Sequence, residues 1–538
     1  MDKTGDVVGR RRQALAAAGA VTVSVMAVSG ATAGASSASS GAVTGPSSSQ
    51  SPYVVGSQPG VVTKSILTVG DSVNLKPDGT PYRMVGIPDG LGAFDNGNGT
   101  FTVLMNHELP NTAGIVRAHG ARGAFVSKWT IRTSDLTVLH GQDLIQTLHT
   151  WNPATNTWQV SNGDAAPARL NRLCSADLAP VSAFYNPATG HGYNGRIFAD
   201  GEEGGTGGRP FGHVVATGDS FELTPWLGNM SFENVVAHPD THSDATVSIG
   251  LDDGDASVGQ QVYLYRGTKT GTGNPVQKAG LANGKLYGIK VSGIPQSEYL
   301  KTDWKVGDTF GVELVDVSAF AGVGGVTDNG VVDTLDEDSQ AKGVTNFQRP
   351  EDGAWDPRHP DDFYFVTTSS FGPLPAEQRT GQTRLWRVRF ADVTDPGKGG
   401  QLTLLVDGPV GTADDPPATG TQSAGSPGPQ MLDNVTVNDR SQVIMLEDVG
   451  NQAYVGGVWL YDTGSGRLVK VAAHDPNRFA VGAPGFLTKD EETSGVIPAP
   501  FLGAGWYLLD VQAHYPISGE LVQGGQLLAV HIPPGKFK

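Results

Sequence analysis

Carboxylate side chains stand beside short apolar runs at several widely separated places in this sequence of 538 residues. These carboxylates are Glu108, Glu202, Glu203, Glu233, Glu351, Glu447 and Asp448. If the apolar runs are strands whose ends meet at one place, the acids converge on a small volume, where bound cations relieve their mutual repulsion. Oxygen ligands of this kind select Ca²⁺ or Mg²⁺, and a softer ligand adds transition metals to the choice. Each pair taken alone is typical of a solvated turn, so the hypothesis depends on the whole set.

Cys174 is the only cysteine of the chain, which excludes a disulfide framework within it. An unpaired thiol brings little advantage to an exported protein, and this favours a role for Cys174 as a metal ligand. The alternative is a small buried apolar side chain, the usual environment of a free cysteine. The C-terminal segment offers three additional candidate ligands, which are Glu492, Asp510 and His514.

The composition restricts the class of partner. The chain carries 37 Lys and Arg against 54 Asp and Glu, a formal net charge of −17, and 38% of its residues are hydrophobic. A nucleic-acid-binding protein needs clustered basic residues to neutralise phosphates, and no such cluster is found, so nucleic acid is excluded as a partner. The apolar content is sufficient for a buried core in a chain of this length.

The elements that position the candidate residues are almost all predicted to be strands. Short apolar runs recur, as at 101–105, 261–265 and 506–511, and turn signals such as Asn283-Gly284 separate them. The 74 glycines and 34 prolines also favour many tight turns over long helices. Runs of this length joined by tight turns are typical of antiparallel hairpins.

One stretch predicts the building unit of the fold. The segments 433–437, 442–447, 458–462 and 467–472 form four consecutive antiparallel strands, which is the content of one propeller blade. We therefore expect an all-β chain whose residues 61–538 form a single catalytic domain, an irregular β-propeller of six or seven blades with insertions. A β-sandwich, or a pair of sandwiches, is the alternative architecture.

The N-terminal segment is predicted to direct export. Arginines at 10–12 and Leu15 precede an uncharged small and apolar run at 16–35, a pattern that resembles a twin-arginine signal peptide removed at about residue 35. Residues 36–60, rich in Ser and Gly, are predicted to be a flexible lead-in. The alternative is a membrane anchor, but the run is only weakly hydrophobic. We expect a periplasmic or secreted protein with no membrane contact after the signal is removed.

Five short motifs follow this signal in a characteristic order. They are Asn171-Arg172-Leu173-Cys174, Gly201-Glu202-Glu203, Phe232-Glu233-Asn234, Arg349-Pro350-Glu351-Asp352 and Leu432-Asp433-Asn434. In this order the motifs resemble those of the PhoX-type alkaline phosphatases, and the sequence looks like a divergent member of that family. The Arg-Pro-Glu-Asp tetrapeptide is the most telling of the five.

The resemblance implies a β-propeller with iron and calcium ions at one mouth, which hydrolyses a small phosphorylated substrate. It implies that Cys174, Glu233 and Glu351 bind the iron pair, that Arg349 holds the phosphate and that Asp433 binds calcium. The expected cofactors are Ca²⁺ and Fe³⁺, and the expected catalytic residues are Arg349, Glu351 and Cys174. A planar guanidinium can donate hydrogen bonds to two phosphate oxygens at once. An ion pair with a neighbouring carboxylate is the alternative role of Arg349.

Two other functions are compatible with the same residues. A calcium-dependent propeller lactonase or esterase would use Glu233, Asn234, Asp433 and Asn434 as central ligands, and would need neither Cys174 nor Arg349. A non-catalytic propeller that binds a polymer or a protein on one face would use metal ions for stability alone.

Overall fold

The computed structural model describes residues 41–537 apart from 206, 255–259, 295–296, 299–300, 302, 322–333, 370–382, 410–427 and 453. These residues belong to the second of the two compact units of the chain, Ser40–Lys538, and the predicted signal peptide lies outside the described residues. None of the helices in these ranges has the length and hydropathy needed to cross a bilayer. The described helices that contain four or more residues are α1 (Val181–Phe184), α2 (Thr224–Leu227), α3 (Pro275–Lys278), α4 (Thr334–Ala341) and α5 (Pro476–Phe479).

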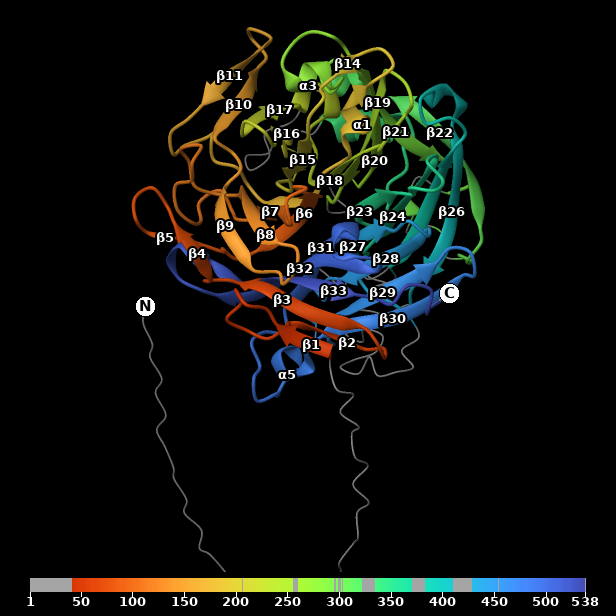
Figure 1. Ribbon diagram of the computed structural model, residues 1–538. Helices are drawn as coiled ribbons and strands as arrows, with labels where there is room; N and C mark the ends of the chain where they lie inside the picture. The colour runs from red at the N-terminus through yellow and green to blue at the C-terminus, as the bar shows by residue number, and fades with distance from the viewer. Residues whose placement is uncertain are drawn as a thin grey trace, which may run out of the picture. The chain divides into compact units, whose positions relative to one another are not determined.

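Six blades of antiparallel strands make up this unit (Figure 1). Blade 1 contains β6 (Pro88–Asp95), β7 (Thr100–His107), β8 (Phe125–Arg132) and β9 (Val138–Asp143). Blade 2 contains β12 (Leu173–Asp177), β15 (Ile197–Glu202), β16 (Pro210–Val214) and β17 (Asp219–Glu222), and it is extended by β10 (Thr147–Asn152) and β11 (Thr157–Ser161). Blade 3 contains β18 (Phe232–Ala237), β19 (Ala245–Asp252), β20 (Val262–Thr268) and β21 (Lys285–Val291).

The last three blades complete the set. Blade 4 contains β23 (Pro350–Trp355), β24 (Asp362–Thr367), β25 (Arg384–Phe390) and β26 (Gly400–Asp407), and β22 (Thr309–Asp316) connects it to blade 3 in one nine-stranded sheet. Blade 5 contains β27 (Leu432–Val437), β28 (Gln442–Glu447), β29 (Gly457–Asp462) and β30 (Arg467–His474). Blade 6 contains β31 (Glu491–Pro498), β32 (Trp506–Pro516), β33 (Gln523–His531) and β3 (Val62–Thr68). Two small hairpins, β4 (Ser72–Leu75) with β5 (Pro81–Arg83) and β13 (Tyr185–Asn186) with β14 (His191–Gly192), lie outside the blades.

The first strand of each blade packs against the first strands of both neighbouring blades, so that β6, β12, β18, β23, β27 and β31 close into a ring. This ring shows that the fold is a β-propeller and not the alternative sandwich, and it fixes the number of blades in the described residues at six. We call these six the inner strands. The predicted four-stranded unit within 433–472 is confirmed as blade 5.

The hydrophobic core is divided among the six junctions between neighbouring blades, and the side-chain alternation of the strands explains why. In β28, Val443 and Met445 pack toward blade 4, whereas Ile444 and Leu446 pack toward blade 6. A strand that is covered on both faces reads as a continuous apolar run, and this is the pattern found at 443–446.

The structure differs from the predicted flexible lead-in at residues 36–60. Within this range, β1 (Gly41–Thr44) pairs in parallel with β3, and β2 (Val54–Gly56) pairs with β30 of blade 5. The pairing is possible because strands from both ends of the chain meet in blade 6, where β3 lies beside β33. The backbone hydrogen bonds of this pairing order a segment that has too few apolar residues to fold by itself.

Candidate metal centre

The second residue of every inner strand is acidic, or is the single cysteine. These six residues, one from each blade, are Asp89, Cys174, Glu233, Glu351, Asp433 and Glu492. The ring of inner strands therefore brings to one place residues that are as much as 400 positions apart in the sequence. We call these six residues the ligand ring.

A break in strand pairing accompanies each member of the ligand ring. In five blades the register between the inner strand and the next strand shifts across this residue, as it does between Leu173 and Ala176 and between Pro350 and Gly353. In blade 6 the shift lies between Thr493 and Val496, just after the ring residue. A bulge of this kind turns a side chain out of the regular alternation of the strand. The bulges thus turn five of the six side chains of the ligand ring away from the packed faces of their blades.

The backbone is strained just before four of these residues. Ile87, Arg172, Arg349 and Met431, each two positions before a member of the ligand ring, have φ values of 50°, 46°, 58° and 45°. A residue with a Cβ atom rarely adopts this left-handed conformation, and it persists only where the surrounding structure holds it. The same strain at equivalent positions of four blades marks the entry to the inner strand as a functional feature of the fold.

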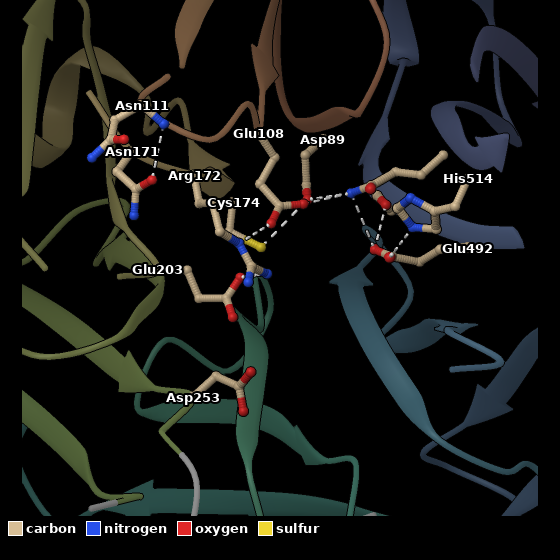
Figure 2. A network of polar contacts seen from close by, with 12 residues as sticks. Asp89, Glu108, Asn111, Asn171, Arg172, Cys174, Glu203, Asp253, Glu492 and His514 are labelled. Atoms are coloured by element: carbon tan, nitrogen blue, oxygen red, sulfur yellow. Dashed lines mark hydrogen bonds and ion pairs between the residues drawn. The ribbon is translucent and has the colours of Figure 1, made fainter. Parts of the chain in front are cut away.

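Three overlapping groups of side chains lie close enough to share ions. In each group one ligand atom per residue lies within 4.8 Å of the others, and the groups are Asp89, Glu108 and Cys174; Cys174, Glu203 and Glu233; and Glu233, Glu351 and Asp433. Because Cys174 and Glu233 each belong to two groups, the three groups form one continuous arc. Figure 2 shows the part of this arc around Cys174, whose Sγ lies 3.4 Å from Oδ2 of Asp89.

The electrostatics of the arc are unfavourable when it holds no cation. Burial, and after it the charge of Glu351, raise the pKa of Glu233 well above its ordinary value. Burial and then Glu351 do the same for the pKa of Asp433, and burial followed by the charge of Glu492 raises the pKa of Asp89. Burial and the carboxylate of Asp89 also raise the pKa of the Cys174 thiol. These groups must bind either protons or metal ions, because their charges cannot coexist in a dry environment.

Buried polar atoms that have no hydrogen-bond partner fit the metal-bound state of this site. Within the described part of the chain, Oε1 of Glu233, Oδ1 of Asn434 and both carboxylate oxygens of Asp510 are buried acceptors without a hydrogen-bond partner. Buried acceptors are rarely left without a donor, since each one costs about 1–3 kcal/mol. Carboxylate and amide oxygens are ligands for Ca²⁺, and the neighbouring thiol suits a transition metal, so the residues present fit the expected cofactors.

Two arginines approach the arc, each from a strained position. Nε of Arg349 donates to Asp253 at 2.8 Å, and Nη2 of Arg349 donates to the other oxygen of Asp253 at 2.7 Å and lies 2.8 Å from Oε1 of Glu351. Nε of Arg172 donates to Glu108 at 2.6 Å, and its Nη2 donates to Glu203. The ion pair that was the alternative role of Arg349 is thus formed, but it uses only one edge of the guanidinium.

The structure differs from the sequence prediction for Glu202 and Glu447, which lie outside the arc. Both carboxylate oxygens of Glu202 accept hydrogen bonds from Arg209, and one of them also accepts from the backbone of Asn171. Glu447 accepts hydrogen bonds from two backbone amides and from the indole of Trp459. These carboxylates are already satisfied by protein donors, so they hold the backbone in place and are not available to a metal ion.

Asp448 and Glu492, two more of the predicted ligands, line a cavity of about 450 Å³ beside the arc, together with Glu108, Arg172 and His514. Asp448 and Glu492 are joined there by a backbone bridge, and burial with the charge of Glu492 raises the pKa of Asp448 to about 7. Burial opposes a charge on His514, but its contact with Glu492 prevails and raises its pKa to about 10. The cavity is therefore a mixed acidic and basic extension of the site.

Three residues of the site were not predicted from the sequence, namely Asp89, Arg172 and Asp253 as the partner of Arg349. A signal for Asp89 does exist, because Pro88-Asp89-Gly90 repeats the Pro-acid step of Pro350-Glu351 at the start of another inner strand. No local signal marks Asp253. It follows β19 and reaches Arg349 only through the pairing of β19 with β18.

A fourth group of possible ligands, Asp356, His359 and Asp362, lies at the hairpin between β23 and β24. Asp362 accepts two hydrogen bonds from Arg389, at 2.5 and 2.6 Å. Asp356 accepts hydrogen bonds from the backbone of Arg358 and from Ser441. Since protein donors satisfy both carboxylates, this group has no need of a cation.

One solved structure of similar fold supports the propeller architecture. A structure of Pseudomonas fluorescens PhoX in complex with vanadate, a transition state analogue, is 11% identical, covers 88% of this chain and 95% of that chain, and superposes with a TM-score of 0.57. A gluconolactonase from Xanthomonas campestris is 10% identical over 89% of this chain and 99% of that chain, with a TM-score of 0.32. The α-L-arabinofuranosidase of Fusarium graminearum in complex with arabinobiose is 8% identical over 87% of this chain and 97% of that chain, with a TM-score of 0.38.

Comparison of sequences identifies the family. The chain has no significant match among curated protein sequences. The profile of the family described as "Alkaline phosphatase PhoX" matches residues 220–501, which are more than half of the chain and contain four members of the ligand ring. The chain belongs to the PhoX alkaline phosphatase family.

Proposed function

We propose that this protein is an exported phosphatase that uses metal ions held by the ligand ring to hydrolyse small phosphoric esters. The observation that carries the proposal is the continuous arc of three ligand groups in a chain of the PhoX family. The vanadate in the similar Pseudomonas structure is a transition state analogue, which agrees with phosphoryl transfer. The buried carboxylates of the arc carry too much negative charge to bind a phosphate unless cations are present.

The arc offers two kinds of ligand environment. Glu233, Glu351 and Asp433 provide only oxygen atoms, which suits Ca²⁺, whereas Cys174 with Glu203 and Glu233 adds a thiolate, which suits iron. Cations bound there would neutralise phosphoryl oxygens and lower the pKa of a coordinated water molecule. Glu233 belongs to both groups, so its carboxylate would provide a ligand to each environment.

The protein itself supplies the orientation of the phosphoryl group. Asp253 and Glu351 hold the Nε and Nη2 edge of Arg349, and its Nη1 has no partner in the described part of the chain. A guanidinium that is fixed on one edge loses little further entropy when the opposite edge binds a ligand. Arg349 is therefore preorganised to donate from Nη1 to a phosphate oxygen.

Asp253→Asn is expected to weaken substrate binding without removing metal ions. The amide keeps the size of Asp253 but cannot accept two charge-assisted hydrogen bonds, so Arg349 loses its fixed orientation. We expect kcat/KM for p-nitrophenyl phosphate to fall about 10-fold, mainly through KM, at unchanged metal content. Glu447→Gln, which alters a buried carboxylate outside the arc, is the control and should leave KM of the folded enzyme unchanged. A variant with wild-type KM would contradict this role of Asp253.

Metal content and turnover test the proposal together. The exported protein is purified without added chelator, its metal ions are quantified, and p-nitrophenyl phosphate hydrolysis is followed before and after dialysis against EDTA. We expect bound calcium and iron, activity that disappears with them, and recovery when they are restored. Hydrolysis of lactones with no turnover of phosphate esters, or full phosphatase activity after complete metal removal, would contradict the proposal.

Export is tested separately, because it depends on residues 1–35, outside the described part of the chain. Replacing Arg11 and Arg12 together by lysine removes the arginine pair and keeps the positive charge. We expect the variant to accumulate inside the cell with its signal uncleaved, while the unmodified chain is recovered outside the cytoplasm. Equal export of both forms would show that the twin-arginine route is not used.

A further inference from the structure

Arg172 and Arg349 occupy equivalent positions in blades 2 and 4. Each arginine lies two residues before a member of the ligand ring, has a left-handed backbone, and pairs with two carboxylates at the edge of the arc. Arg349 has a role implied by the family resemblance, whereas none is assigned to Arg172. The equivalence raises the question of what Arg172 binds.

The hydrogen-bond donors of Arg172 are only partly used. Its Nε donates to Glu108 and its Nη2 donates to Glu203, which fixes one edge of the guanidinium (Figure 2). Nη1, which carries two N–H groups, has no protein partner in the described ranges. The pattern is the same as in Arg349, where Nε and Nη2 are fixed and Nη1 is left for a ligand.

The position of Arg172 gives a ligand access to this free group. Its side chain is 45% exposed and lines the cavity of about 450 Å³ beside the arc. Arg172 and His514 are the only basic residues among the described residues that line this cavity, which also has four carboxylates in its wall. An anion that approaches the arc from this side needs a local positive charge, and Arg172 provides it.

The backbone of Arg172 is held in its strained conformation from both sides. Its N–H donates to the carbonyl of Leu109 at 3.0 Å, and its carbonyl accepts from the amide of Glu203 at 2.8 Å. Ile87 and Met431 share this conformation in blades 1 and 5, so it belongs to the entry of the inner strand, and the two hydrogen bonds fix the backbone from which the Arg172 side chain reaches the arc.

We propose that Arg172 is a second phosphate-binding arginine, whose Nη1 contacts one phosphoryl oxygen of the substrate while Nη1 of Arg349 contacts another. This inference rests on the proposed phosphatase function. Arg172 contacts Glu203 and Arg349 contacts Glu351, and each of these carboxylates has an oxygen within 4.8 Å of a carboxylate oxygen of Glu233, so the two guanidinium groups reach neighbouring parts of the arc. A tetrahedral phosphoryl group directs its oxygens apart, so two arginines from different blades can each bind a different oxygen.

The test compares Arg172→Ala and Arg172→Lys with a matched control. Arg122→Ala removes an ion-paired arginine of similar exposure, 39%, whose partner Asp164 lies outside the arc. For each variant we measure kcat and KM with p-nitrophenyl phosphate, the inhibition constant of inorganic phosphate, and metal content. With metal content unchanged, Arg172→Ala should lower kcat/KM and weaken phosphate inhibition by roughly 10- to 100-fold. Arg172→Lys should recover only part of the loss, because a single ammonium cannot donate to Glu108, Glu203 and a phosphate in one plane.

Two other outcomes would overturn the inference. Wild-type values in both Arg172 variants would show that the guanidinium does not touch the substrate. A loss of activity that parallels a loss of metal ions would show that Arg172 only maintains Glu108 and Glu203. If the wild-type protein hydrolyses no phosphate ester, the proposed function fails instead, and calorimetric titration with inorganic phosphate still decides whether binding depends on Arg172.

Discussion

Replacing Cys174 by alanine is expected to remove iron from the protein and to lower kcat for phosphate esters by about 100-fold or more. Cys174 contributes the only sulfur atom of the arc and belongs to two of its three ligand groups. Without it, two groups lose a member at once, and the remaining carboxylates select hard cations only. Metal analysis and turnover on the same sample measure both effects.

The folded state should survive this change, so the loss is chemical in origin. Alanine is smaller than cysteine by one sulfur atom, and a cavity of that size costs on the order of 1 kcal/mol. Cys174→Ser is the informative companion, because it restores an oxygen ligand and should retain calcium but not iron. A Cys174→Ala protein with wild-type metal content and activity would show that the thiol is only a buried apolar side chain.

Removing the metal ions is expected to destabilise the protein, and more strongly as the pH rises. The pKa values of Asp89, Glu233, Glu351 and Asp433 are raised in the folded chain, and that of Asp448 is raised to about 7. Below the ordinary carboxyl pKa of about 4, these groups are protonated in both the folded and the unfolded state, so they cause no loss of stability. Above it the unfolded chain releases protons that the folded chain retains, and folding stability falls.

The expected slope is on the order of 1.4 kcal/mol per pH unit for each such group, until the pH passes its folded pKa. Thermal unfolding of the metal-free protein should therefore move to a lower temperature between pH 5 and pH 8, while the metal-loaded protein changes little. Asp433→Asn removes one source of repulsion, and its metal-free form should be more stable than the metal-free wild type at pH 8. A metal-free protein with the same unfolding temperature at both pH values would contradict the account.

A blade could be predicted from the sequence where apolar runs and turn residues mark each of its strands. Residues 433–472 combine apolar runs with short turns, and these features alone determine the four strands of blade 5. The run at 443–446 is apolar throughout because it packs on two neighbouring blades, a feature that a single sheet exposed on one face would not require.

Other features depend on contacts that no local pattern encodes. The pairing of β3 with β33 joins the two ends of the described chain, and the ordering of β1 and β2 follows from that closure. Glu202 and Glu203 are adjacent in sequence, yet Glu202 accepts hydrogen bonds from Arg209, whereas Glu203 lies in the arc. In an extended strand neighbouring side chains point to opposite faces, so the motif alone did not determine which acid lies in the site.

The bulges explain why the remaining site residues were found only in part. Each bulge displaces one side chain from the alternation of its strand, and the sequence does not specify where along the strand this occurs. The family resemblance implied Cys174, Glu233, Glu351 and Asp433, and Glu492 was a candidate from the sequence, whereas Asp89 joins the ligand ring only through the sixfold arrangement of the inner strands.

The location of bound ions tests the central claim, that one residue from each blade gathers metal ions at the centre of the propeller. Crystals of the purified exported protein, measured at wavelengths on either side of the iron absorption edge, would locate iron and distinguish it from calcium. We predict an iron peak beside Sγ of Cys174 and the carboxylate of Glu233, and calcium peaks among the carboxylates of the ligand ring. Fully active crystals with no anomalous peak within the ring would contradict this account of the protein.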